Sequence, residues 1–246
     1  MRKFAKAFTL AEVLITLAIV GIVAALTIPT LITDYQKRVT AVKVRKSYAE
    51  LSQALRLAQA EYGDINTWKT VFSSDNAENS RAFAENYITP YMKIAKYCGV
   101  GSEADENCGS SSVGAYSSNY LLSNGTGLSI AAYNASGIIN LRITVNMKTG
   151  KNKIPGTDSF DFVILPDAFE KGILPYGYTQ NITREEIKSG YTVNYEDRNH
   201  QTNSIRIACL PVEDSDYNED TETYVRHSCT YLLFVDNFVF KEDYPY

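Results

Sequence analysis

The hydrophobic residues of this chain are concentrated in one long run near its start. Residues 8–32 read FTLAEVLITLAIVGIVAALTIPTLI, and Glu12 is the only charged side chain among them. A helix rises about 1.5 Å per residue, so these 25 residues cover about 37 Å, enough to cross a hydrocarbon core of about 30 Å. The run therefore predicts a membrane-spanning helix. An isolated buried carboxylate near its start would cost about 2.5 kcal/mol or more, so Glu12 is expected to have a partner.

Beyond Pro29 the hydrophobic pattern becomes one-sided. Apolar residues recur at spacings of three and four, which is typical of one face of a helix, at Val44, Tyr48, Leu51, Leu55, Ala58 and Tyr62. Residues 33–63 are therefore predicted to continue the helix amphipathically, and Gly63 is a suitable stop. An isolated coiled coil would show the same stripe. Fewer than three heptads, followed by a strand-rich region, favour a helix that lies on a sheet.

Residues 64–246 are predicted to form a globular head with antiparallel strands. Residues 127–134 and 138–147 read as a hairpin, with a turn at 134–137, and residues 159–165 alternate Phe160, Phe162 and Ile164 on one face. The segment 230–240, TYLLFVDNFVF, is expected to add another strand or pair of strands. Residues 64–120 suggest only short helices or turns. The fold class expected is α+β, with a long N-terminal helix packed on an antiparallel sheet.

Composition and charge restrict the class of protein. The chain of 246 residues has 45% hydrophobic and 21% charged residues, which indicates a folded core and excludes disorder throughout. Its net charge of −4 argues against a general nucleic-acid binder, because such proteins need clustered cations. No specific binding of nucleic acid is therefore expected.

The basic residues before the apolar run allow a second interpretation. Arg2, Lys3 and Lys6 could form the basic start of a secretory signal peptide that is cut near Ala25, leaving a Sec-exported soluble enzyme or binding protein. Signal peptides, however, have apolar cores of about 7 to 15 residues, and this run is longer. An uncleaved anchor fits better. Because cations also follow the run, from Lys37 to Lys46, charge bias alone does not decide the topology.

The string from Lys6 to Leu14, KAFTLAEVL, resembles the cleavage and methylation segment of type IV prepilins and type II secretion pseudopilins. The resemblance implies that a prepilin peptidase cuts between Ala7 and Phe8 and that Phe8 is then N-methylated. It makes Glu12 the acid of the motif and Pro29 the residue that bends the helix. The chain departs from the family at Ala7, where glycine is usual. A small residue still fits a narrow peptidase pocket.

This resemblance supplies a partner for the acid and implies a function. Cleavage creates an amine at Phe8, and Glu12 can neutralise the amine of a neighbouring subunit, which would set the register of a filament. The resemblance implies a subunit of a type IV pilus-like filament or a type II secretion pseudopilus, with homologous subunits and an inner-membrane assembly platform as partners. The chain would cross the inner membrane once, with its head in the periplasm or at the cell surface. Residues 1–7 would be the leader and 8–32 the membrane and assembly helix.

Four cysteines point to an oxidising compartment. Pairing Cys98 with Cys108 and Cys209 with Cys229 closes the two shortest loops, and each bond would stabilise the fold by about 3 kcal/mol. Disulfides persist outside the cytoplasm, which agrees with an exported head. Zinc is the competing interpretation, and no CxxC pair supports it.

An acidic loop between Cys209 and Cys229 is a candidate calcium site. Oxygen side chains alternate there in a manner that could surround Ca²⁺, at Asp214, Asp216, Asn218, Asp220 and Glu222. The loop lacks the glycine and the final glutamate of a calcium-binding helix–loop–helix, because Glu219 and Val225 stand at those positions. A solvated acidic loop is the favoured interpretation. No other cofactor is expected.

The sequence contains no familiar enzyme motif. It has two histidines and lacks a GxSxG elbow, an HExxH helix and a GxxxxGK[ST] loop. No catalytic residue is assigned, and the chain is not expected to be an enzyme.

Overall fold

The computed structural model describes residues 9–68, 76–101, 116–132, 138–145, 154–165, 172–196, 202–210, 226 and 228–246. The chain divides into two compact units, Met1–Thr40 and Ala41–Tyr246, and each is described by itself. Helix α1 (Leu10–Tyr62) begins in the first unit and ends in the second. It ends where Gly63 adopts a φ of 81° and donates its backbone N–H to the Gln59 carbonyl. The stop predicted at Gly63 is confirmed, and glycine fits there because it has no Cβ to oppose a positive φ.

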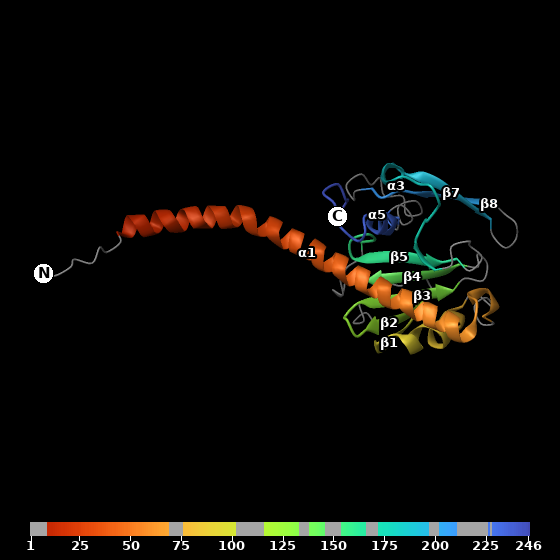
Figure 1. The fold of residues 1–246 in the computed structure, drawn as a ribbon. Helices are drawn as coiled ribbons and strands as arrows, with labels where there is room; N and C mark the ends of the chain where they lie inside the picture. Colours follow the sequence, from red (N-terminus) through yellow and green to blue (C-terminus); the bar gives the residue numbers. More distant parts are fainter. Residues whose placement is uncertain are drawn as a thin grey trace. The chain divides into compact units, whose positions relative to one another are not determined.

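The second unit is built around a six-stranded antiparallel sheet (Figure 1). Its strands follow one another in chain order: β1 (Ile94–Val100), β2 (Ser118–Leu122), β3 (Gly127–Ala132), β4 (Ile139–Thr144), β5 (Ser159–Ile164) and β6 (Ile173–Pro175). The hairpin predicted from the alternating pattern is confirmed as β3 and β4, and the next predicted strand is β5. A separate two-stranded sheet pairs β7 (Tyr191–Glu196) with β8 (Thr202–Ile207).

Helix α1 packs on this sheet from Ala41 onward, as its one-sided pattern predicted. The buried side chains of this part of the helix are Ala41, Val44, Ser47, Leu51, Ala54, Leu55 and Ala58. Ser47 binds the β2–β3 connection, because its hydroxyl lies 3.0 Å from the Thr126 hydroxyl and accepts a hydrogen bond from the Asn124 amide. Tyr62 is a correction to the predicted stripe. It is 48% exposed and lies in the last turn of the helix, where its ring and that of Tyr87 meet in a T-shaped contact.

The two faces of the sheet differ in chemistry. Phe160, Phe162 and Ile164 of β5 are buried on the apolar face, where the Tyr48 ring of α1 lies 5.2 Å from that of Phe162. Asp161 points to the opposite face and is paired with Arg142 of β4, directly across the strand pair, at 2.6 Å. The alternation of strand side chains therefore separates an apolar core from a buried ion pair.

Short helical segments follow α1 along the chain, before the first strand of the sheet. After α1 come the 3₁₀ turn η1 (Ile65–Thr67), α2 (Ala77–Phe83), the π turn η2 (Ala84–Ile88) and the 3₁₀ turn η3 (Thr89–Tyr91). Trp68 and Tyr87 stack here with their ring centroids 4.1 Å apart. Near the C-terminus lie α3 (Arg184–Ser189) and α5 (Cys229–Val235).

The prediction of strands in residues 230–240 is wrong, because the structure places helix α5 and a turn there. The Val, Phe and Tyr residues of this segment favoured a strand, but residues 229–233 form a helix that is buried on all sides. The helix is followed by a turn in which Asn237 and Phe238 have φ values of 55° and 59°. Tertiary contacts override strand propensity here, since Phe234 and Phe238 both pack against Tyr48.

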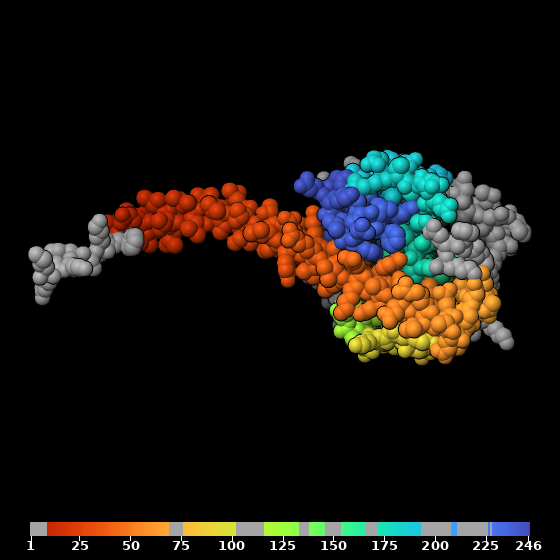
Figure 2. All heavy atoms as spheres, viewed as in Figure 1, coloured from red at the N-terminus to blue at the C-terminus, as the bar shows by residue number. Residues whose placement is uncertain are grey.

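The C-terminal part of the second unit lies beside α1. Figure 2 shows the segment that contains α5 along one side of the second half of α1, in agreement with the contacts of Tyr48. This half of the helix also carries exposed residues, among them Val42, which is 67% exposed.

Candidate functional site

The first part of α1 presents a long, exposed apolar surface. An 18-residue stretch of the helix is long and apolar enough to cross a membrane, and none of that stretch is buried. Leu14, Leu17 and Ile22 are each more than half exposed, and the same holds for most of their apolar neighbours. Large apolar surfaces of this kind mark contact with lipid or protein. The uncovered apolar helix is therefore the candidate functional site.

The hydroxyl groups of this helix are satisfied by its own backbone. Thr16 donates to the Val13 carbonyl at 2.9 Å, and Thr27 donates to the Val23 carbonyl at 2.9 Å. Thr30 and Thr33 make equivalent bonds to carbonyls one turn earlier. An unpaired hydroxyl in an apolar medium costs several kcal/mol, about 4–8 by cyclohexane transfer. These bonds allow four threonines to lie in the apolar helix without that penalty.

Glu12 closes a capping box at the start of α1. Its Oε2 atom accepts hydrogen bonds from the backbone N–H and the hydroxyl of Thr9, both at 2.8 Å, while the Thr9 hydroxyl accepts from the Glu12 N–H at 3.3 Å. Two donors at the end of the helix are thereby satisfied. Sequence reasoning missed this role, although the pattern T-x-x-E before an apolar run is its known signature.

Pro29 lies inside α1, and the helix continues through it. Proline has no N–H, so it cannot donate to the carbonyl of Ala25 one turn earlier. The Thr33 hydroxyl donates to the Pro29 carbonyl at 3.0 Å. A helix bend at Pro29 stays a prediction.

Several residues singled out in the sequence lie outside the described residues. These are Ala7 and Phe8 of the cleavage site, Cys108, and the candidate calcium ligands Asp214, Asp216, Asn218, Asp220 and Glu222. Among the residues that the structure does describe, no group of three or more His, Cys, Asp or Glu side chains could hold a metal ion. The structure joins Cys209 to Cys229 by a disulfide, and Cys98 is also disulfide-bonded.

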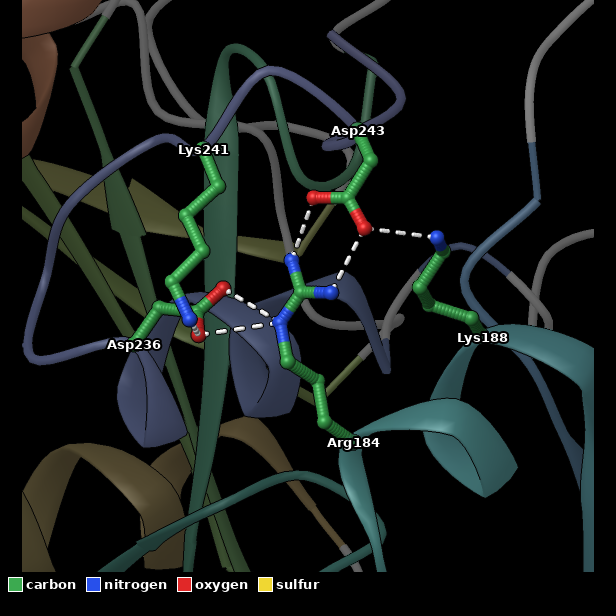
Figure 3. Close-up of polar contacts among 5 residues, drawn as sticks. All are labelled: Arg184, Lys188, Asp236, Lys241 and Asp243. Atoms are coloured by element: carbon green, nitrogen blue, oxygen red, sulfur yellow. Dashed lines mark hydrogen bonds and ion pairs between the residues drawn. The ribbon is translucent and has the colours of Figure 1, made fainter.

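The head contains an ionic cluster that sequence reasoning did not find (Figure 3). We call it the C-terminal clamp, and it comprises Arg184, Lys188, Asp236, Lys241 and Asp243. The Arg184 guanidinium donates two bonds of 2.6 Å to Asp243 and, through Nε, two of 3.0 Å to Asp236. The clamp ties the first turn of α3 to the end of α5 and to the C-terminal segment.

The environment of the clamp shifts the pKa values of two of its members. Hydrogen bonds from Arg184 and Lys188 hold the pKa of Asp243 well below its ordinary value. The bonds to Asp243 likewise raise the pKa of the Arg184 guanidinium. The Asp236 side chain is only 1% exposed, so its charge needs the cations of Arg184 and Lys241 beside it. The clamp therefore has a structural role in the head.

A second contact fixes the last residues of the chain. The buried Tyr244 hydroxyl donates to the Gly156 carbonyl at 2.7 Å, and Arg226 donates to the carbonyls of Pro155 and Leu210 at 3.1 and 2.8 Å. Gly156 has a φ of 79°, and a Cβ there would lie 2.5 Å from that of Cys229. A glycine is required at this close approach.

Two family models match the chain. The prokaryotic N-terminal methylation motif, which is characteristic of type IV pilins and pseudopilins, matches residues 2–28. The model described as a family of unknown function (DUF6613) matches residues 30–246. No curated protein and no solved structure matches. The long apolar helix, the antiparallel sheet and the methylation motif together make this an α+β protein of pilin-like architecture and a type IV pilin-like precursor. Since the second model extends over most of the chain, the protein belongs to the family of unknown function DUF6613.

Proposed function

We propose that this protein is a structural subunit of a type IV pilus-like filament or of a type II secretion pseudopilus. The observation that carries the proposal is an apolar helical stretch that no described residue of the chain buries, headed by an acid inside a methylation motif. Burial of apolar surface contributes about 25 cal/mol per Å², so packing of such helices against one another would drive assembly. The subunit is held in the bilayer by the same surface before it is assembled.

Processing prepares the end of the helix for this packing. Prepilin peptidase would cut between Ala7 and Phe8, and the new amine at Phe8 would be N-methylated. Removal of the leader takes away Arg2, Lys3 and Lys6, which leaves 21 Lys and Arg against 28 acids and a net charge near −7. The mature start of the chain then carries one positive amine close to Glu12.

Glu12 would pair with the amine of a neighbouring subunit. Its bonds to Thr9 use one carboxylate oxygen, Oε2, and a carboxylate can accept about four hydrogen bonds in all. The capping box therefore leaves acceptor capacity for an ammonium group. A desolvated charge pair adds little net stability but penalises misplacement by about 3–5 kcal/mol. Its role would be to set the register of each arriving subunit.

The proposed location and partners follow from this assembly. The chain would cross the inner membrane once, with its head in the periplasm or at the cell surface, and would join an extracellular filament when assembled. Its partners would be homologous subunits, the prepilin peptidase and the inner-membrane assembly platform.

Two substitutions separate the register role of Glu12 from its capping role. Glu12→Gln removes the charge, while glutamine at this position can still complete a capping box. We expect the variant to enter the membrane normally and to be lost from sheared filament fractions by at least tenfold. Thr9→Ala removes the two hydroxyl bonds of the capping box and keeps the charge, so it should be incorporated to within a few-fold of the native level. Normal incorporation of Glu12→Gln would contradict the register role.

A further inference from the structure

Helix α1 carries a run of cations shortly after its apolar part. We call residues 37–46 the basic segment. It contains Lys37, Arg38, Lys43, Arg45 and Lys46 and no acid, in a protein whose net charge is −4. The nearest acids along the chain are Asp34 and Glu50. The segment is continuous α-helix.

Most of this charge is not neutralised within the described chain. Arg38, Lys43 and Arg45 have no ion-pair or hydrogen-bond partner for their side chains among the residues that the structure describes. The Nζ atom of Lys46 lies 3.9 Å from Glu50, and both side chains of this pair are substantially exposed, so the pair is weak. The side chains of Arg38 and Arg45 are both exposed.

The position of the basic segment along the helix matches the polar layer of a bilayer. The apolar run ends at Ile32, so a rise of about 1.5 Å per residue puts Lys37 about 8 Å further along the helix and Lys46 about 21 Å. The headgroup layer on each side of a bilayer is about 5–8 Å thick. The first cations therefore reach headgroup depth. The later ones, from Lys43 to Lys46, lie about 9–16 Å beyond that layer, at or past the screening length of about 8–10 Å, and tilt of the helix brings them nearer.

We propose that the basic segment binds the anionic phospholipid headgroups of the leaflet that faces the head. Arginine suits this partner, because its guanidinium can donate two parallel hydrogen bonds to one phosphate. Cations on this side of the membrane oppose the charge bias that keeps basic flanks in the cytoplasm. Contact with anionic headgroups offsets that cost and holds the unassembled subunit in the bilayer. The choice of leaflet rests on the orientation proposed above, whereas the lipid preference does not.

The test uses the purified full-length protein in neutral detergent. Dioleoylphosphatidylglycerol or dioleoylphosphatidylcholine is titrated, and bound lipid is counted by native mass spectrometry. Each cation near an anionic surface contributes about fivefold in affinity. Arg38 lies near headgroup depth and Arg45 lies past the screening length, so the double variant Arg38→Gln/Arg45→Gln should bind phosphatidylglycerol about 5- to 25-fold more weakly and phosphatidylcholine unchanged. The matched control, Lys93→Gln/Lys96→Gln, removes two exposed cations that lie just before and within β1 and should stay within twofold of native.

Three outcomes would overturn the inference. The first is equal affinity of the native protein for the two lipids, and the second is an equal loss of phosphatidylglycerol in the control variant. The third is a protein dimer in the same spectra that disappears with Arg38→Gln/Arg45→Gln while lipid binding stays unchanged, because the basic segment would then bind a second copy. Circular dichroism checks that both variants keep their helix. A negative result in the lipid titration would not change the result expected for Glu12→Gln. The lipid proposal and the filament proposal can therefore be rejected independently.

Discussion

The carboxylate of Glu12 has a partner before any neighbouring subunit arrives. Sequence reasoning treated it as a charge that waits for another chain, whereas the structure places both Thr9 donors on its Oε2 atom. Charge-assisted bonds of this kind are about twice as strong as neutral ones. The cap therefore lowers the cost of holding a lone subunit in the bilayer. The charge that remains is what we propose a neighbouring amine to recognise.

Gly156 provides a test of packing at the level of one methyl group. A Cβ there would lie 2.5 Å from the Cys229 Cβ, and φ is already 79°. We expect Gly156→Ala to lower the free energy of unfolding by about 1–2 kcal/mol for the backbone and by about 1–3 kcal/mol more for the collision. Urea unfolding in detergent measures the sum of these two losses in the free energy of unfolding.

Gly125 is the matched control for this substitution. It has the same φ of 79° and nothing within 4 Å of the position of a Cβ, so Gly125→Ala should carry the backbone cost alone. Equal losses at the two glycines would show that the contact between Gly156 and the disulfide does not constrain the fold.

The C-terminal clamp makes the stability of the head depend on pH. Arg184 and Lys188 depress the pKa of Asp243 in the folded state, so the unfolded chain binds the proton more readily. The stabilisation is therefore complete above the unfolded pKa of about 4 and is lost as the pH falls below it. In Asp243→Asn this loss should be absent, and the free energy of unfolding should depend less steeply on pH between about 4 and 2.

Glu242→Gln is the control for the clamp prediction, because it removes a neighbouring acid that makes none of the clamp contacts. Its pH dependence should follow that of the native protein. If Asp243→Asn and Glu242→Gln had the same slope between pH 4 and 2, the clamp would not be the source of the acid sensitivity.

The elements that sequence reasoning predicted are those whose pattern is local. The period of α1, its stop at Gly63 and the alternation in β3, β4 and β5 are all visible within about ten residues. Strands β1 and β2 were not predicted, since β1 has irregular pairing and only partial burial, so its side chains do not alternate cleanly. Helix α5 was mistaken for strands, because its helical state depends on the core and the disulfide to Cys209.

Some of the functional residues could likewise be predicted from the sequence, and others could not. The apolar run, Glu12 and Pro29 are apparent in the sequence, and the methylation motif agrees with them. The clamp could not be predicted, because Arg184 and Asp243 are separated by 59 residues and meet only after α3 and the C-terminal segment have packed. Contacts of this range depend on the whole fold and leave no periodic signal.

At the scale of the whole molecule, the surfaces of the two units differ in chemistry. Residues 41–246 bury an apolar core between α1 and a sheet and close it with ion pairs and a disulfide, as an exported domain does. The large apolar residues from Leu10 to Ile32 are exposed among the residues that the structure describes. A polymer of such subunits would give that surface a partner, and a bilayer would cover it beforehand.

Mass spectrometry of the N-terminal peptide of the protein purified from membranes tests this account most directly. We predict a mature chain that begins with N-methylated Phe8 and retains the whole apolar part of α1. A mature chain that begins at Leu26, directly after Ala25, would contradict the filament account. Such a chain would lack Glu12 and the uncovered helix surface, and the protein would then be an exported globular domain.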